Sequence, residues 1–210
     1  MRRYLCLCFL LSLLVQAATA NPFPASPDPI RDTLEFMQLQ ASGSTFEPGI
    51  LQKLQQLKAQ SKFFNRALDG SNLAVWIEVE GAITLNSNVL RLSDNYAEKA
   101  RQCQQKMLTN PEQSQRLRQQ ETVLWRLHDE RILELSAALA HEGTHAYLGN
   151  TENAKADETA AYNAEAAWLR ILWDRLPQHR SKIRDLENNL QESYLGCTDA
   201  PIPRTLPSAP

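Results

Sequence analysis

Hydrophobic and polar positions repeat with helical spacing over most of the chain. Apolar residues recur every three or four positions in six stretches, and this pattern predicts a helix in each: residues 29–40, 48–68, 96–108, 112–148, 154–176 and 178–195. The pattern in the fourth stretch also permits a break near its middle. Proline or glycine stands beside most of these stretches, as is typical where helices begin or end. We therefore expect a mainly helical protein.

One region alternates instead of following the helical period. Residues 73–79 and 82–86 place hydrophobic side chains at every second position and contain β-branched and aromatic residues. The intervening Glu80-Gly81 is suited to a turn, so the two segments predict a β-hairpin. The predicted fold class is mainly α with a small β-hairpin or sheet, an α+β arrangement.

The first twenty residues have the order of a secretory signal peptide. Arg2 and Arg3 precede an apolar run over residues 5–15, and small residues follow at 18–20. The run is shorter than the roughly 20 residues that a helix needs to span a bilayer. We expect residues 1–20 to be removed and the mature chain to be exported, to the periplasm or the extracellular space, without a membrane span.

Composition indicates one globular domain after this segment. The chain has 210 residues, of which 43% are hydrophobic and 22% are charged. We expect a proline-rich leader at 21–28, a single domain at 29–197 and a loose proline-rich tail at 198–210. The formal net charge of −2 becomes −4 when residues 1–20 are removed, and basic residues do not cluster. This excludes the basic patch typical of nucleic-acid binding.

Two of the four cysteines, Cys103 and Cys197, lie outside the predicted signal peptide. In an oxidising compartment, two cysteines most simply form one disulfide. The alternative is that both are zinc-binding thiolates, but they lack the close spacing that such sites favour. We therefore predict a disulfide between them.

The residues with the clearest chemistry are His141, Glu142 and His145, which form an H-E-x-x-H motif. Residues four apart lie on one face of a helix, so the two imidazoles can bind one metal ion. Glu142 then lies beside the metal, where a general base for metal-activated water is needed. The motif falls inside the predicted helix 112–148, which supplies the required context.

A catalytic zinc usually has three protein ligands, so a third must come from elsewhere. Thr151 occupies the position at which the extended metzincin motif has a third histidine. We favour Glu158, because it lies thirteen residues beyond His145, which leaves room for a turn and a return along the first helix. Other carboxylates remain as alternatives: Glu152, Asp157 and Glu165.

Several further residues are candidates for supporting roles. Tyr162 lies one turn beyond Glu158 and either orients a ligand, binds an oxyanion or is an ordinary core tyrosine. Asp157 is a candidate for orienting a histidine without binding the metal. His128 and His179 are expected to be exposed rather than to take part in the chemistry.

The motif followed by Glu158-x-x-Ala161-Tyr162 resembles the zincin metallopeptidases of the gluzincin type. The resemblance covers about residues 133–168 and implies a minimal zincin-like core of packed helices. It also implies one zinc ion held by His141, His145 and Glu158, with Glu142 as the base. By the same resemblance, a substrate peptide would lie along an edge strand upstream of the metal helix, and residues 82–86 are the candidate strand.

These observations lead to the hypothesis of an exported zinc-dependent peptidase that cleaves peptide or protein substrates. Two alternatives remain at this point. One is a zinc-stabilised binding protein without turnover, although such a site has no use for Glu142. The other is a zinc amidase that acts on the cell envelope, for which the same residues would serve.

Overall fold

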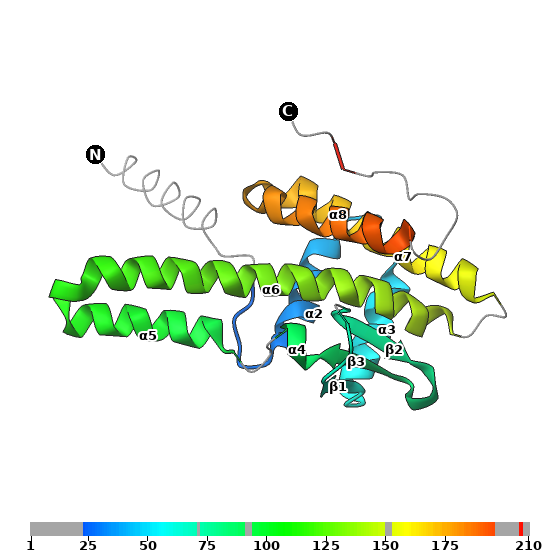
Figure 1. The fold of residues 1–210 in the computed structure, drawn as a ribbon, viewed down its shortest axis with the longest axis horizontal. Coiled ribbons are helices and arrows are strands. Elements are labelled where there is room, and N and C mark those ends of the chain that lie inside the picture. Colours follow the sequence, from blue (N-terminus) through cyan, green and yellow to red (C-terminus); the bar gives the residue numbers. More distant parts are fainter. Residues whose placement is uncertain (1–22, 71, 91–93, 150–152, 196–205, 208–210) are drawn as a thin grey trace, which may run out of the picture.

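One long helix, α6 (Ser114–Leu148), runs through the molecule, and the other elements pack along it (Figure 1). The computed structural model describes residues 23–70, 72–90, 94–149, 153–195 and 206–207. The predicted signal peptide at 1–20 lies outside these residues. Helix α5 (Tyr96–Thr109) packs on the N-terminal half of α6. The C-terminal half of α6 meets the remaining elements: α2 (Pro29–Ala41), α3 (Pro48–Ala59), the sheet, α7 (Ala154–Arg175) and α8 (Arg180–Leu195).

Most helix boundaries follow from local sequence. The Asp28 carboxylate accepts hydrogen bonds from the N–H groups of Ile30 and Arg31 and so caps α2, with Pro29 at its first position. Asn153 caps α7 in the same manner. Side-chain acceptors and proline at these positions satisfy or remove the unpaired N–H groups of a helix start. The predicted helices at 29–40, 96–108, 154–176 and 178–195 are confirmed, and 112–148 is one unbroken helix from Ser114.

The prediction of one helix over 48–68 is wrong. Helix α3 ends at Ala59, and Ser61 adopts a left-handed backbone conformation with φ of 56°, which turns the chain out of the helix. Strand β1 (Phe63–Arg66) follows and pairs in parallel with β3 (Ala82–Asn86). The pairing is non-local, so the helical spacing of the apolar residues could not reveal it.

The predicted hairpin is present, but its position in the sheet differs from the prediction. Strand β2 (Ala74–Ile77) pairs antiparallel with β3, opposing Trp76 to Ile83, and the short helix η1 (Glu78–Glu80) with the left-handed Gly81 connects them. The strand order is β1-β3-β2. Residues 82–86 therefore form the central, fully buried strand, and they cannot be the edge strand for a substrate. Helices with a small mixed sheet confirm the predicted α+β class.

The hydrophobic core lies between α6 and the elements around it. Phe36 on α2 and Trp168 on α7 are fully buried and meet edge to face, with ring centroids 6.3 Å apart. The Trp168 indole N–H donates to the Ser136 hydroxyl on α6 over 2.9 Å, so this buried polar group is satisfied. These contacts fix α7 against the part of α6 that precedes the H-E-x-x-H motif.

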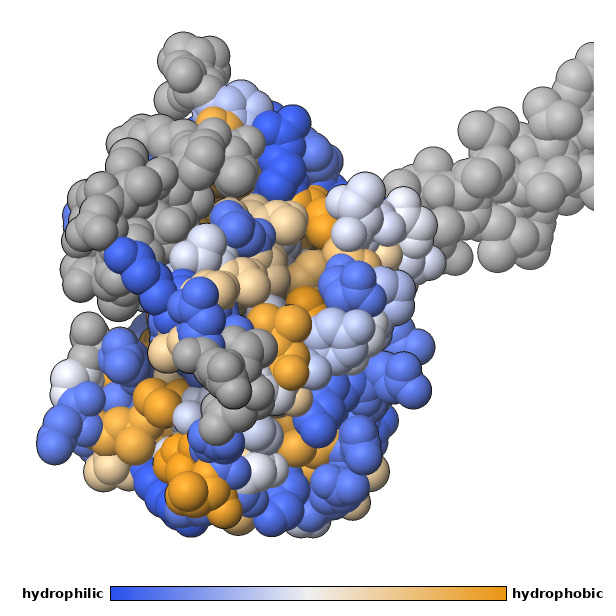
Figure 2. All heavy atoms as spheres, turned by 90° about the vertical axis from the view of Figure 1, so that its right-hand side faces the viewer, coloured by the Kyte–Doolittle hydropathy of each residue, from blue (hydrophilic) through white to orange (hydrophobic). Residues whose placement is uncertain are grey.

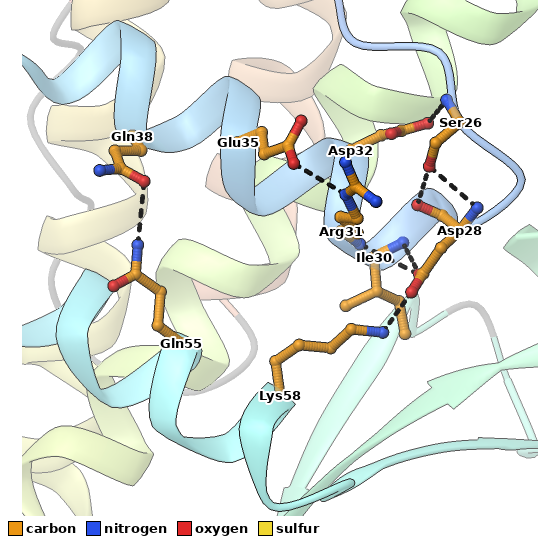
Figure 3. Close-up of polar contacts among 9 residues, drawn as sticks. All are labelled: Ser26, Asp28, Ile30, Arg31, Asp32, Glu35, Gln38, Gln55 and Lys58. Atoms are coloured by element: carbon orange, nitrogen blue, oxygen red, sulfur yellow. Dashed lines mark hydrogen bonds and ion pairs between the residues drawn. The ribbon is translucent and has the colours of Figure 1, made fainter.

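Both proline-rich ends of the chain contact the domain. Phe23 is buried and stacks on Phe36 with ring centroids 4.8 Å apart. Figure 3 shows the next residues, where the Ser26 N–H donates to Asp32 and the Asp28 carboxylate pairs with Lys58 of α3. In the tail, which was predicted to be loose, Leu206 is buried and its N–H donates to the Glu187 carboxylate. Arg184 donates to the carbonyl oxygen of Pro207, and the other tail residues lie outside the described part.

The predicted disulfide is not supported. Cys103 is a free thiol, buried on the face of α5 that packs against α6. Its predicted partner, Cys197, lies outside the described residues. None of the described helices has the length and apolar character that crossing a membrane requires.

Candidate metal centre

Three of the predicted ligands converge at the C-terminal end of α6. The Nε2 atoms of His141 and His145 are 3.3 Å apart, because residues four apart lie one turn above each other. Glu158 on α7 places Oε2 3.5 Å from the His141 nitrogen and Oε1 3.5 Å from the His145 nitrogen. The three residues together could hold a metal ion. The sequence prediction of this group is confirmed to that extent.

The spacing of the candidate donor atoms suits a tetrahedral zinc ion. Zinc–nitrogen and zinc–oxygen bonds of roughly 2.0–2.2 Å at tetrahedral angles place neighbouring ligand atoms about 3.3–3.6 Å apart. The two imidazole nitrogens are 3.3 Å apart, and each lies 3.5 Å from a different oxygen of the Glu158 carboxylate. Two imidazoles and a carboxylate are also a donor set that zinc accepts, and three ligands leave a fourth position for water.

The turn between α6 and α7 brings Glu158 to the histidines. Helix α6 ends at Leu148, and Gly149 has φ of 69°, a conformation that favours glycine. Ala161 of α7 is fully buried, and its small side chain allows the close approach of the two helices that the sequence suggested. Glu158 is the most exposed of the three candidate ligands, with 41% of its side chain accessible, so solvent reaches the site from its side.

Two further side chains of α7 surround His141. The Tyr162 ring meets the imidazole edge to face, with centroids 4.6 Å apart and planes at 77°. Glu165 places Oε2 3.3 Å from Nδ1, the nitrogen that faces away from the other two ligands. Tyr162 is thus a packing partner of a candidate ligand, as one of the sequence alternatives had it. Glu165 was predicted only as an alternative ligand.

Asp157, the sequence candidate for orienting a histidine, is half-buried in the first turn of α7. Burial lowers the pKa of His145, and the charge of Asp157 opposes this effect. The Glu165 carboxylate lies at ion-pair distance from Nδ1 of His141, the ring nitrogen that faces away from the site. Spacing offered a signal for this, because Glu165 lies seven residues beyond Glu158 and therefore on the same helix face. Glu152, the third alternative, lies outside the described residues.

Glu142 is held beside the site by the sheet. Its Oε2 accepts a 2.7 Å hydrogen bond from the backbone N–H of Trp76 on β2. Burial raises the pKa of Glu142 to about 7, against the opposing effects of the His141 charge and the Trp76 N–H. A buried carboxylate with a pKa near neutrality is suited to taking up and releasing a proton. The contact to Trp76 was not predicted, since it joins segments 66 residues apart.

The charges around the two histidines act in opposite directions. Burial alone would lower the pKa of His141, but Glu158 and Glu165 outweigh it and raise the pKa to about 10. Burial and the neighbouring His141 charge lower the pKa of His145. The hydrogen bond to His141 lowers the pKa of Glu158. The carboxylates of Glu158 and Glu165 thus surround the His141 imidazole with negative charge, at the place where a metal cation would fit.

No protein-family model matches this chain, and no curated protein or solved structure is similar to it at a significant level. The function of this chain is therefore inferred from the geometry of its candidate metal centre.

The other two histidines are less exposed than predicted. His128 is buried, and its Nε2 lies 2.9 Å from the carbonyl oxygen of Pro24 in the leader. His179 is half-buried and meets Phe23 edge to face, with centroids 5.0 Å apart. The leader covers both histidines, and because it has no periodic pattern this contact could not be predicted from the sequence. They contact the leader rather than the candidate metal centre.

A surface hollow of about 400 Å³ lies elsewhere, between α7 and the segment that joins α2 to α3. Arg170 and Asp174 line it but form an ion pair with each other over 3.1 Å. Arg175 donates to the carbonyl oxygens of Leu39 and Ser42. These charges are used in structural contacts, so the candidate chemistry lies at the metal centre and not in this hollow.

Gly143, between the two histidines, allows α3 to pack closely on the site. A Cβ atom there would lie 3.0 Å from side-chain atoms of Ile50 and Leu54, both of which are buried. We expect Gly143→Val to lower the free energy of unfolding by about 1–3 kcal/mol through overpacking. Denaturant titration against Gln119→Val, at an exposed position of the same helix, measures this. Equal stability of the two variants would show that α3 can move away without cost.

Zinc affinity should rise with pH. The raised pKa of His141 means that the imidazole is protonated near neutral pH, where its ion pairs stabilise the metal-free fold. This stabilisation is complete below the ordinary histidine pKa of 6.5 and is lost as pH rises towards 10. Since zinc binds the neutral ring, one proton must leave, and affinity should rise roughly tenfold per pH unit. Chelator competition at pH 7, 8 and 9 measures the slope; a flat profile would contradict a protonated His141.

Proposed function

We propose that this chain is an exported zinc-dependent peptidase, similar in its site to the gluzincin-type metallopeptidases. The observation that carries the proposal is the convergence of the imidazole nitrogens of His141 and His145, 3.3 Å apart, with the Glu158 carboxylate, whose two oxygens each lie 3.5 Å from one of them. Glu142 next to this group supports a catalytic site rather than a structural one. A structural zinc site is typically closed by four protein ligands and needs no adjacent base.

The proposed chemistry divides between the metal and Glu142. A zinc ion held by the three ligands supplies Lewis-acid activation of water and of the scissile carbonyl group. Glu142 uses Oε2 to accept the Trp76 N–H, which leaves Oε1 to take the proton of the attacking water. The same carboxyl group then gives that proton to the nitrogen of the leaving amine. The Trp76 contact fixes the carboxylate, so little reorganisation is needed when the proton moves.

The substrate backbone is proposed to lie along β2 instead of residues 82–86. In the β2–β3 ladder the Asn86 N–H donates to the Leu73 carbonyl, which places the Trp76 N–H on the outer side of β2. This outer side faces Glu142. An extended peptide that adds to it would bring its own backbone next to the candidate metal centre. Figure 2 shows the end of the molecule where α6 meets α7, on which apolar and hydrophilic groups alternate.

Cleavage assays with metal control test the proposal. The mature chain should cleave members of a quenched-fluorescence peptide library, lose this activity to a zinc chelator and regain it when zinc is restored. Cleavage of peptidoglycan but not of peptides would instead indicate the cell-envelope amidase. If neither is cleaved, and chelation lowers the melting temperature, the chain is a zinc-stabilised binding protein and the proposal is wrong.

A further inference from the structure

We propose that Glu165 is a positioning residue of the metal centre, which holds the His141 ring through Nδ1 while Nε2 faces the metal. The inference rests on the proposed zinc site. The Glu165 Oε2 atom lies 3.3 Å from Nδ1, whereas Glu158 approaches Nε2 of the same ring. The carboxylates of Glu158 and Glu165 thus contact different nitrogens of the same imidazole.

Burial makes this contact important for the ring. The side chains of His141 and Glu165 are only 12% and 16% exposed. The Nδ1 atom of His141 is inaccessible to solvent and makes no hydrogen bond among the described residues. Its contact with Glu165 has the distance of an ion pair but not the alignment of a hydrogen bond. A buried ring N–H without an acceptor is unfavourable, and Glu165 is the acceptor within reach. An acceptor at Nδ1 places the proton there, which frees the lone pair on Nε2 for a metal.

The spacing of three residues on α7 explains how one helix can contact both ring nitrogens of His141. Glu158, Tyr162 and Glu165 are at positions i, i+4 and i+7, which lie on one helix face. This face presents a candidate ligand, then an aromatic ring packed edge to face on His141, then the carboxylate at Nδ1. Tyr162 limits the tilt of the imidazole, and Glu165 sets its rotation.

The test measures zinc affinity in variants of the full mature chain. Glu165→Ala should weaken zinc binding by roughly 10–100-fold, as loss of a residue that orients a ligand does. Glu165→Gln should regain part of this loss, because its amide oxygen still accepts the Nδ1 proton. Asp174→Asn is the matched control: it removes one carboxylate from the same helix at an exposed ion pair with Arg170, and should change affinity less than about twofold.

Two spectroscopic measurements separate positioning from other roles. In zinc-loaded protein with ¹⁵N-labelled histidine, the Nδ1–H signal of His141 should be protected from exchange, and Glu165→Ala should remove that protection. With cobalt in place of zinc, Glu165→Ala should keep the tetrahedral absorption bands, since all three proposed ligands remain. Bands that change as strongly as in Glu158→Ala would make Glu165 a ligand and overturn the inference.

The remaining outcomes are also decisive. Unchanged zinc affinity in Glu165→Ala, with only a lower melting temperature of the metal-free protein, would make the role purely structural and overturn the inference. A wild-type chain that binds no zinc would overturn it as well. A wild-type chain that binds zinc with the expected variant series but cleaves no peptide would sustain the role of Glu165 and refute only the proposed peptidase function.

Discussion

Glu142→Gln is expected to retain zinc and to lose peptide hydrolysis by about 10²–10⁴-fold, the usual contribution of a general base. Glutamine has nearly the same shape, and its amide oxygen can still accept the Trp76 N–H that Glu142 accepts over 2.7 Å. It cannot take a proton from water at neutral pH. The measurement is kcat/KM on a fluorogenic peptide, together with the zinc content of the purified variant.

Glu130→Gln on the same helix provides the control for this variant. Glu130 pairs with Arg126 at the surface over 3.7 Å and has no contact with the candidate metal centre. Its substitution should leave both kcat/KM and zinc content near the wild-type values. Hydrolysis retained by Glu142→Gln would contradict the proposed mechanism, because that mechanism assigns the proton transfer to Glu142.

The second large effect is expected from Glu158→Ala, which should lose zinc more completely than any other single substitution on α7. It removes the carboxylate whose two oxygens each lie 3.5 Å from one of the two imidazole nitrogens. The loss of affinity should exceed the roughly 10–100-fold range of a residue that only orients a ligand. Chelator competition gives the affinity, and zinc content after dialysis gives an independent check.

Asp157→Ala is the most informative comparison with Glu158→Ala, because the sequence left Asp157 as an alternative third ligand. The sequence made Asp157 a candidate for orienting a histidine, and in the structure Glu165 lies at ion-pair distance from Nδ1 of His141. We expect Asp157→Ala to lose less zinc affinity than Glu158→Ala, because the charge of Asp157 acts on His145. If Asp157→Ala lost more zinc than Glu158→Ala, the assignment of the third ligand would be wrong.

The sequence by itself determined the local features of this protein. Most helix positions could be predicted, because apolar spacing and capping residues such as Asp28 and Asn153 act within one or two turns. The convergence of His141 and His145 has the same origin, since a helix places residues four apart on one face. Glu158 was predictable as a ligand because the turn after Gly149 is short and sends α7 back along α6.

Tertiary structure decided every feature that depends on pairing between distant segments. Strand β1 inserts on the far side of β3, so residues 82–86 became central and β2 became the strand that faces Glu142. The leader covers His128, and Cys103 is a free thiol buried on the face of α5 that packs against α6. Glu158 and Glu165 share a helix face, and only the packing of α7 against α6 gives one of them Nε2 and the other Nδ1. Such contacts depend on how helices and strands pack against one another, and not on the spacing of hydrophobic residues within any one of them.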